Sequence, residues 1–293
     1  MTPEVTRMTG DLAAMLAGND ATRVDPRTQP VRFHHLKAMG RSAAHCYESF
    51  QADGESTLSR RLGSGAHALA FGQPVALWDR PAKKGKGKAP RSGAEYEEFK
   101  AEHAGAVILN RKEYDRAMRI ATALGNHPHA SSLLFRSTAV HERTILWSQN
   151  GRDRRSTPDC WCPDSLYVAE LKTTRCAAPD LFRFDVKRMA YHAQLADQMD
   201  AIEFETGRRP REAYIIAVET VAPFVVQTFR LTDADIDQGA RIVRLWFESF
   251  RVAEDANAWG GYSDTTIDLD LSDGDDLELT FADDEPSAEQ EDE

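Results

Sequence analysis

The chain has few cysteines and no long apolar run. Only four of its 293 residues are cysteines, and their spacing is irregular: Cys46, Cys160, Cys162 and Cys176. No stretch approaches the roughly 18 consecutive apolar residues that suggest a membrane-spanning helix. The N-terminal sequence MTPEVTRMTGDLAAMLAGND also lacks the charged and then apolar pattern of a secretory signal. We therefore expect reduced thiols, no membrane association and a cytoplasmic location.

Two further patterns are missing. The sequence has no Gly-x-x-x-x-Gly-Lys-Ser/Thr phosphate-binding loop, so it gives no support to an ATP-driven helicase. We also find no internal repeat. The composition that is present, 41% hydrophobic and 28% charged residues, is typical of a soluble globular protein. A length of 293 residues suits one large domain with additions, or two small domains.

The net charge of −11 is distributed very unevenly. Fourteen of the 47 acidic residues lie in 264–293, which has no Lys or Arg, so 36 basic residues face 33 acidic ones elsewhere. We therefore expect a mildly basic body at 1–263, made of a polar extension at 1–30 and a main domain at 31–263, followed by a disordered acidic tail at 264–293. The tail either solubilises the protein, docks a partner or mimics nucleic acid over a basic groove.

The pattern of apolar residues predicts helices first and then a mixed core. Residues 79–94 are rich in Gly, Lys and Pro, which predicts a flexible basic loop, either a solvated insertion or a phosphate contact. The predicted order is helices, then strand, strand, long helix, strand, strand and helix, which predicts an α/β fold with a mixed central sheet, flanking helices and N-terminal helical additions. The expected helices are 34–50, 60–72, most of 95–135, 184–205 and 233–255, and the expected strands lie in 138–149, 165–174 and 212–231. Asp233 or Asp235 is the expected cap of the last helix.

Two carboxylates and a lysine form the most informative pattern. Asp159 precedes Glu170 by eleven residues, which allows both to meet at one end of a hairpin. Glu170 and Lys172 are two apart in a predicted strand, so they share a face. Two carboxylates can bind a hard divalent cation, which activates water and polarises a phosphoryl group, while a lysine orients the water or offsets negative charge. The pattern indicates phosphodiester hydrolysis; the alternative is a salt bridge on an edge strand.

These residues belong to a longer series of motifs. The chain resembles the PD-(D/E)xK nuclease superfamily and, more closely, the RecE-type (exonuclease VIII-like) double-strand DNA exonucleases of phages and prophages. The similarity extends over about 33–250 and departs from the family at Thr157, where an arginine is common, and at Glu170, where aspartate is commoner. The motifs stand in the family's order: Gly63 to His67, His141-Glu142, Thr157-Pro158-Asp159, Glu170-Leu171-Lys172-Thr173-Thr174, and Tyr191 to Gln194.

The resemblance implies a role for each matching residue. Lys172 is the implied catalytic lysine. Tyr191 and Gln194 are three apart, hence on one helical face, and are implied to flank the site and either contact DNA or brace Lys172. The implied metal-binding residues are His67, Asp159, Glu170 and Glu142. The alternatives are a satisfied core histidine at 67 and ordinary helix packing at 191 and 194.

The resemblance also implies a function. It implies a Mg²⁺-dependent exodeoxyribonuclease, with Mn²⁺ as a possible substitute, that degrades linear double-stranded DNA from 5′ to 3′ in a bacterial host. The exposed 3′ strands would enter recombination by strand annealing. The implied partners are double-stranded DNA ends, further copies of the chain in a ring, and a single-strand annealing protein, RecT-like or similar. The alternatives are another nuclease of the superfamily, either an endonuclease or a single-strand exonuclease, and a non-catalytic module that binds DNA ends.

Other candidate ligands are weaker. Cys160 and Cys162 suggest an iron–sulfur relative, but such a protein needs a cysteine pair beyond the catalytic strand, and here only Cys176 follows it. We therefore expect no cluster. His127 and His129 are predicted to lie in a loop and not to bind metal.

Overall fold

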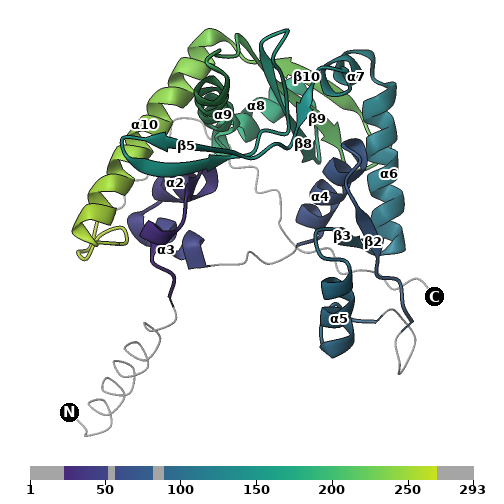
Figure 1. Cartoon of the computed structure of the whole chain (residues 1–293), viewed down its shortest axis with the longest axis horizontal. Helices are drawn as coiled ribbons and strands as arrows, with labels where there is room; N and C mark the ends of the chain where they lie inside the picture. Colours follow the sequence, from purple (N-terminus) through teal and green to yellow (C-terminus); the bar gives the residue numbers. More distant parts are fainter. Residues whose placement is uncertain (1–22, 52–56, 82–88, 269–293) are drawn as a thin grey trace, which may run out of the picture. The chain divides into compact units, whose positions relative to one another are not determined.

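A computed structural model describes residues 23–51, 57–81 and 89–268 (Figure 1). The chain divides into a unit of residues 1–260 and a short unit of residues 261–293. The described residues of the second unit, 261–268, are exposed and contain no helix or strand. Most of the predicted N-terminal extension, the centre of the predicted basic loop and most of the acidic tail lie outside the described residues.

A mixed five-stranded sheet forms the centre of the first unit. Its strand order is β10-β9-β8-β7-β4; β8 and β9 are parallel and the other pairs are antiparallel. A parallel pair needs a crossover connection, which the helices α8 and α9 supply. This confirms the predicted mixed α/β core. The strands are β4 (Val140–His141), β7 (Cys160–Cys162), β8 (Tyr167–Thr174), β9 (Glu212–Glu219) and β10 (Val226–Arg230).

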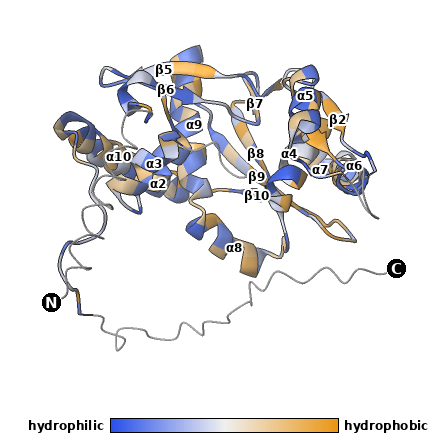
Figure 2. Cartoon of the chain, turned by 90° about the horizontal axis from the view of Figure 1, so that it is seen from below, coloured by the Kyte–Doolittle hydropathy of each residue, from blue (hydrophilic) through white to orange (hydrophobic). Residues whose placement is uncertain are grey.

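Helices cover both faces of this sheet. Alternation along β8 directs Val168 toward one core, with α9, and Leu171 toward the other, with α4 and α6. Figure 2 shows α9 and α10 on one side of β8 and β9, and α4 and α6 on the other. None of the described helices is long and apolar enough to cross a membrane. The covering helices are α4 (Leu58–Ala70), α6 (Arg111–Asn126), α7 (Pro128–Leu134), α8 (Pro179–Arg188), α9 (Tyr191–Thr206) and α10 (Asp233–Ala256).

Two smaller sheets flank the central one. The first has the order β1-β6-β5, and the N-terminal helices α2 and α3 pack beside it against α10. The second pairs β2 with β3 and packs against α5 through Trp78 and Phe99. The elements are η2 (Pro26–Thr28), β1 (Val31–Arg32), α2 (Phe33–Met39), α3 (Ala43–Gln51), β2 (Val75–Leu77), α5 (Ala94–Glu102), β3 (Val107–Leu109), β5 (Ile145–Gln149) and β6 (Arg152–Ser156).

Several predicted elements are broken in the structure. The predicted strand 138–149 is two strands in different sheets, because Glu142 adopts a left-handed backbone with φ of 44°. The predicted helix 184–205 is interrupted at Ala190, where φ is 56°. The predicted helix 34–50 divides near Gly40, where an added Cβ would lie 2.6 Å from the Trp246 ring. Each break turns the chain so that the following element packs against a different neighbour.

Other differences concern elements that the prediction omitted or placed wrongly. Strands β1, β2, β3 and β6 were not predicted, and β3 lies within the range predicted as helical. Helix α10 is capped by the Thr232 side chain, which accepts a hydrogen bond from the backbone N–H of Asp235, and not by Asp233 or Asp235. Asp235 instead completes the capping box by accepting from the Thr232 backbone N–H.

A buried ion pair joins the flanking sheet to α9. Arg154 of β6 has 0% exposure, and its Nη2 lies 2.5 Å from Asp197 Oδ1 on α9. The guanidinium also lies 4.8 Å from the Trp147 ring centroid and 5.3 Å from that of Phe247. A charge buried this deeply needs its partner, because neither group is solvated.

We predict that Arg154→Met lowers the free energy of unfolding by about 3–5 kcal/mol, because it leaves Asp197 buried without its cation. The double variant Arg154→Met, Asp197→Leu should recover most of the loss, since apolar side chains of similar volume replace both charges. Urea denaturation of the two variants and the unchanged chain measures both effects. A double variant as unstable as the single one would contradict the prediction.

Candidate active site

The β7–β8 hairpin brings the predicted acids together. Antiparallel pairing sets Cys160 opposite Ala169, so Asp159 lies beside Glu170. The backbone N–H of Leu171 donates to Asp159 Oδ2 at 2.8 Å, which fixes the aspartate against β8. The structure therefore places both carboxylates at one end of the hairpin, as their spacing predicted.

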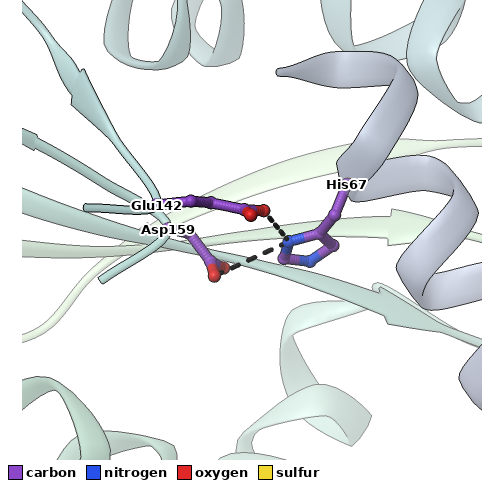
Figure 3. Close-up of side chains that lie close together, drawn as sticks. All are labelled: His67, Glu142 and Asp159. Carbon is purple, nitrogen blue, oxygen red and sulfur yellow. Dashed lines mark ion pairs between the residues drawn. The ribbon is translucent and has the colours of Figure 1, made fainter. Parts of the chain in front are cut away.

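His67 of α4 points its Nδ1 at two carboxylates (Figure 3). Nδ1 lies 3.5 Å from Glu142 Oε1 and 3.6 Å from Asp159 Oδ1. The other ring nitrogen, Nε2, lies 3.1 Å from the Leu171 carbonyl oxygen, to which it can only donate. This hydrogen bond selects the tautomer whose Nδ1 carries a lone pair, the form that binds a metal.

Glu142 reaches the site from the break between β4 and β5. Its backbone N–H donates to the Asp159 carbonyl oxygen at 3.1 Å, and its left-handed conformation departs from the extended path of β4. The Gln73 side-chain amide, just after α4, donates to Glu142 Oε2. Sequence reasoning missed Gln73, which stands outside every motif and meets Glu142 only through folding.

The charges in this group oppose one another. Burial lowers the pKa of His67, but the charge of Asp159 and the hydrogen bond to Glu142 outweigh it and raise the pKa to about 9. Burial, with the nearby Glu170 charge, raises the pKa of Asp159 to about 7. The hydrogen bond to His67 lowers the pKa of Glu142. Without a metal, a proton on His67 therefore supplies the positive charge that the carboxylates favour.

The donor set fits a divalent cation. One imidazole nitrogen and two carboxylates offer ligand atoms that all lie within 4.8 Å of one another. Carboxylates suit Mg²⁺ and Mn²⁺, and an imidazole ligand is compatible with the softer of the two. Within the described ranges no other group of this kind occurs. His127 and His129 stand at the α6–α7 helix junction, not in the predicted loop; His127 caps α7 and His129 contacts Thr228.

Glu170 lies beside this group, and three donors hold it. Its Oε1 accepts from Lys172 Nζ at 2.8 Å and Gln194 Nε2 at 2.6 Å, and its Oε2 accepts from Gln198 Nε2 at 2.7 Å. Glu170 is therefore not one of the three clustered ligands, and its role as a metal ligand stays a prediction. Gln198 was missed by sequence reasoning, although it stands four residues after Gln194 on the same face of α9.

Lys172 contacts three of the residues that the sequence pattern placed at this site. Besides Glu170, its Nζ donates to Gln194 Oε1 at 3.1 Å and lies 4.7 Å from the Tyr191 ring centroid. Burial lowers the pKa of Lys172, but the charges of Glu170 and Asp159 outweigh it and raise the pKa. The side chain is therefore a positively charged donor at neutral pH, held on the face of β8 that it shares with Glu170.

Cys160 and Cys162 pack in the apolar core between β7, α7 and β8. Both are free thiols, and Cys160 Sγ lies 3.6 Å from the Leu133 carbonyl oxygen. Burial raises the pKa of Cys160 to about 12, which keeps this thiol protonated and unreactive. These contacts assign Cys160 a packing role.

Comparison with known proteins identifies the family to which the chain belongs. A family model described as a PDDEXK-like domain of unknown function (DUF3799) matches residues 33–266. The fold is similar to that of an exonuclease candidate from Eubacterium rectale, with a TM-score of 0.56 and 11% identity over 78% of this chain and 82% of that one. A phage-related exonuclease from Haemophilus somnus 129PT gives a TM-score of 0.34 and 13% identity, over 78% of this chain and 97% of that one. No curated protein matches the sequence.

The family match covers most of the chain, including all the motifs that carry the resemblance. The similarity to the Eubacterium rectale protein shows a shared fold, and at such low identity it shows only that. The predicted PD-(D/E)xK relationship is thus confirmed: the chain belongs to the PDDEXK-like family DUF3799.

Proposed function

We propose that the protein is a divalent-metal-dependent exodeoxyribonuclease that degrades linear double-stranded DNA from 5′ to 3′. The single observation that carries the hydrolytic part is the convergence of His67 Nδ1 with Glu142 and Asp159. Asp159 lies opposite Glu170 in the β7–β8 hairpin, and Glu170 in turn binds Lys172. The preference for duplex ends and the polarity are supported by the order of the motifs, which resembles that of the RecE-type exonucleases.

His67, Glu142 and Asp159 would hold the cation, with Glu170 as a further ligand if it exchanges one of its hydrogen bonds. A bound divalent cation supplies Lewis acidity, which polarises a phosphoryl oxygen and makes a water molecule more acidic. The protein's own contribution is a fixed arrangement of donors. His67 is oriented by Leu171, Asp159 by the same residue's backbone N–H, and Glu142 by Gln73.

Lys172 stabilises the reaction through its charge. Its raised pKa keeps it protonated at neutral pH, so it donates hydrogen bonds to a phosphate oxygen or to the attacking water and does not act as a base. Gln194 and the Tyr191 ring restrict where its Nζ lies. A donor fixed before the substrate arrives needs no reorganisation in the transition state.

The proposal extends to partners and cofactors. We propose Mg²⁺ as the cofactor, with Mn²⁺ as a substitute, and linear duplex ends in the bacterial cytoplasm as the substrate. A homo-oligomeric ring and a single-strand annealing protein as partner are proposed from the resemblance. Other nucleases of the superfamily would differ in their dependence on DNA ends. A non-catalytic module has no evident use for Glu170 and Lys172, since burying charged groups is costly.

We predict that the protein with Mg²⁺ degrades a linearised plasmid and leaves the closed circle intact, and that EDTA abolishes this. Lys172→Ala should slow digestion by about 10²–10³-fold, because it removes one fixed charge-stabilising donor. Gel electrophoresis of timed samples gives the rates. Lys112→Ala on the exposed side of α6 is the matched control and should leave the rate unchanged. Cutting of the closed circle would show that the protein is an endonuclease and not an exonuclease. Binding of DNA without digestion would favour a non-catalytic module.

Metal affinity should depend on pH through His67. The cation must displace the proton from a group whose pKa is raised to about 9. Affinity for Mn²⁺ should therefore rise about tenfold per pH unit below that value, level off above it, and be accompanied by proton release. Below the Asp159 pKa of about 7 the dependence should steepen, since a second proton competes. Titration calorimetry in two buffers of different ionisation enthalpy measures both affinity and proton release.

His67→Gln removes one titrating ligand, so affinity should fall and its dependence on pH should weaken to the part that Asp159 contributes, whose pKa rises when the His67 charge is lost. His129→Gln, an exposed histidine on α7, is the control and should behave like the unchanged chain. An affinity and a pH dependence that are both unchanged in His67→Gln would show that the cation binds elsewhere.

A further inference from the structure

A cationic cavity opens beside Lys172. Its volume is about 450 Å³, and β1, α2, β6 and the first turns of α9 contribute to its walls. This volume falls in the range of about 300–1,000 Å³ that small-molecule sites occupy. None of its lining residues is acidic. The charged lining residues are Arg32, Lys37, Arg155 and Lys172.

Two of these charges are placed side by side by strand pairing. Strand β1 pairs in parallel with β6, and the register sets Arg32 beside Arg155. Paired residues point to the same face, and like charges in that position destabilise a sheet. Burial and the Arg155 charge both lower the pKa of Arg32, which agrees with mutual repulsion. The fold therefore keeps a repulsive pair in the wall of this cavity.

No carboxylate neutralises this pair. Among the residues that the structure describes, none lies within ion-pair distance of Arg32, Lys37 or Arg155. The two arginines on the opposite face of β6 do have anionic partners. Arg152 pairs with Glu254 at 3.0 Å, and Arg154 pairs with Asp197 at 2.5 Å. The fold neutralises the guanidinium groups that it buries and leaves those facing the cavity without an anion.

A buried polar side chain, Gln198, also lines this cavity. Gln198 is 3% exposed, and its Oε1 is buried without a hydrogen-bond donor. Its Nε2 must face the acceptor Glu170 Oε2, so the two ends of the amide cannot be exchanged. Lys37 Nζ contacts the Met189 sulfur at 3.8 Å. Gln198 shows only that the cavity wall is polar, whereas Lys37 has no strong acceptor among the described residues, and an anionic ligand would supply one.

We propose that Arg32, Arg155 and Lys37 form a phosphate-binding subsite, which holds a DNA phosphate next to the one that is cleaved at Lys172. The inference rests on the proposed nuclease function for the identity of the ligand. Paired guanidinium groups bind phosphate oxygens through parallel hydrogen bonds, and a bound anion removes their repulsion. Lys172 belongs both to this cavity and to the Glu170 network, which places the two phosphates on one path. The phosphate is either a terminal phosphomonoester or an internal phosphodiester.

The first test measures the subsite without DNA. Thermal unfolding is followed with and without inorganic phosphate, against sodium chloride of equal ionic strength, for the unchanged chain, Arg32→Gln, Arg155→Gln and Lys37→Gln. Without phosphate, the two arginine variants should melt at a higher temperature than the unchanged chain, because each removes the like-charge pair. Phosphate should raise the melting temperature of the unchanged chain more than that of any variant. Arg119→Gln, an exposed arginine on α6 with the same charge change, should match the unchanged chain.

The second test identifies the source of the phosphate. Short duplexes with a 5′-phosphate or a 5′-hydroxyl are bound in EDTA, so that cleavage does not interfere. Each variant should bind about tenfold more weakly and lower the slope of log affinity against log salt by about 1, as expected for a lost phosphate contact. A subsite for the terminal phosphate predicts that the 5′-phosphate duplex binds more tightly, and that the variants lose this preference. A subsite for an internal phosphate predicts an equal loss with both duplexes.

The outcomes separate this inference from the proposed function. Equal stabilisation by phosphate in the unchanged chain, the three variants and Arg119→Gln would overturn the subsite, whether or not the protein cuts DNA. Selective loss in the three variants, in a protein that digests no DNA, would uphold the subsite and overturn the nuclease function instead.

Discussion

A charge on a buried strand must be neutralised where it stands, and this constraint organises the molecule around Glu170. Glu170 is 3% exposed on the central strand β8, so each of its carboxylate oxygens needs a donor. Lys172 comes from the same strand, and Gln194 and Gln198 come from α9. The need to satisfy one carboxylate thus fixes α9 against β8. It also sets the position of Lys172, because the lysine shares Gln194 with the carboxylate.

The same constraint ties the flanking sheet to this core. Strand β6 carries two buried arginines, which are neutralised by Asp197 on α9 and by Glu254 on α10. Helices α9 and α10 approach so closely that a Cβ at Gly239 would lie 2.5 Å from the His192 carbonyl oxygen. One helix pair therefore connects the five-stranded sheet with the β1-β6-β5 sheet, and the two glutamines that hold Glu170 are on α9, the helix whose Asp197 holds Arg154. Arg32 and Arg155 are more exposed and do not fall under this rule, but their juxtaposition is a like-charge pair that stability alone does not favour.

The sequence was informative where the signal is local. The hairpin spacing of Asp159 and Glu170, the two-residue period of Glu170 and Lys172, and the face shared by Tyr191 and Gln194 are short-range rules, and the structure follows them. The position of Glu142 could not be derived in this way, because it depends on a left-handed residue with no glycine to mark it. Strand β6 was missed for a different reason. Its sequence RDRRS reads as a polar loop until partners far along the chain neutralise Arg152 and Arg154.

The same strand accounts for the departure at Thr157. The resemblance to RecE-type exonucleases implies an arginine directly before Pro-Asp, and the threonine here removes that positive charge from beside the candidate metal site. Thr157 and Arg155 both line the cavity next to Lys172, so a guanidinium reaches that cavity from two residues upstream. The register of β1 adds Arg32 beside it. The β1–β6 strand pair therefore supplies the positive charge of this cavity. An anionic ligand is attracted by where a charge lies in the folded protein, whichever position in the motif carries it.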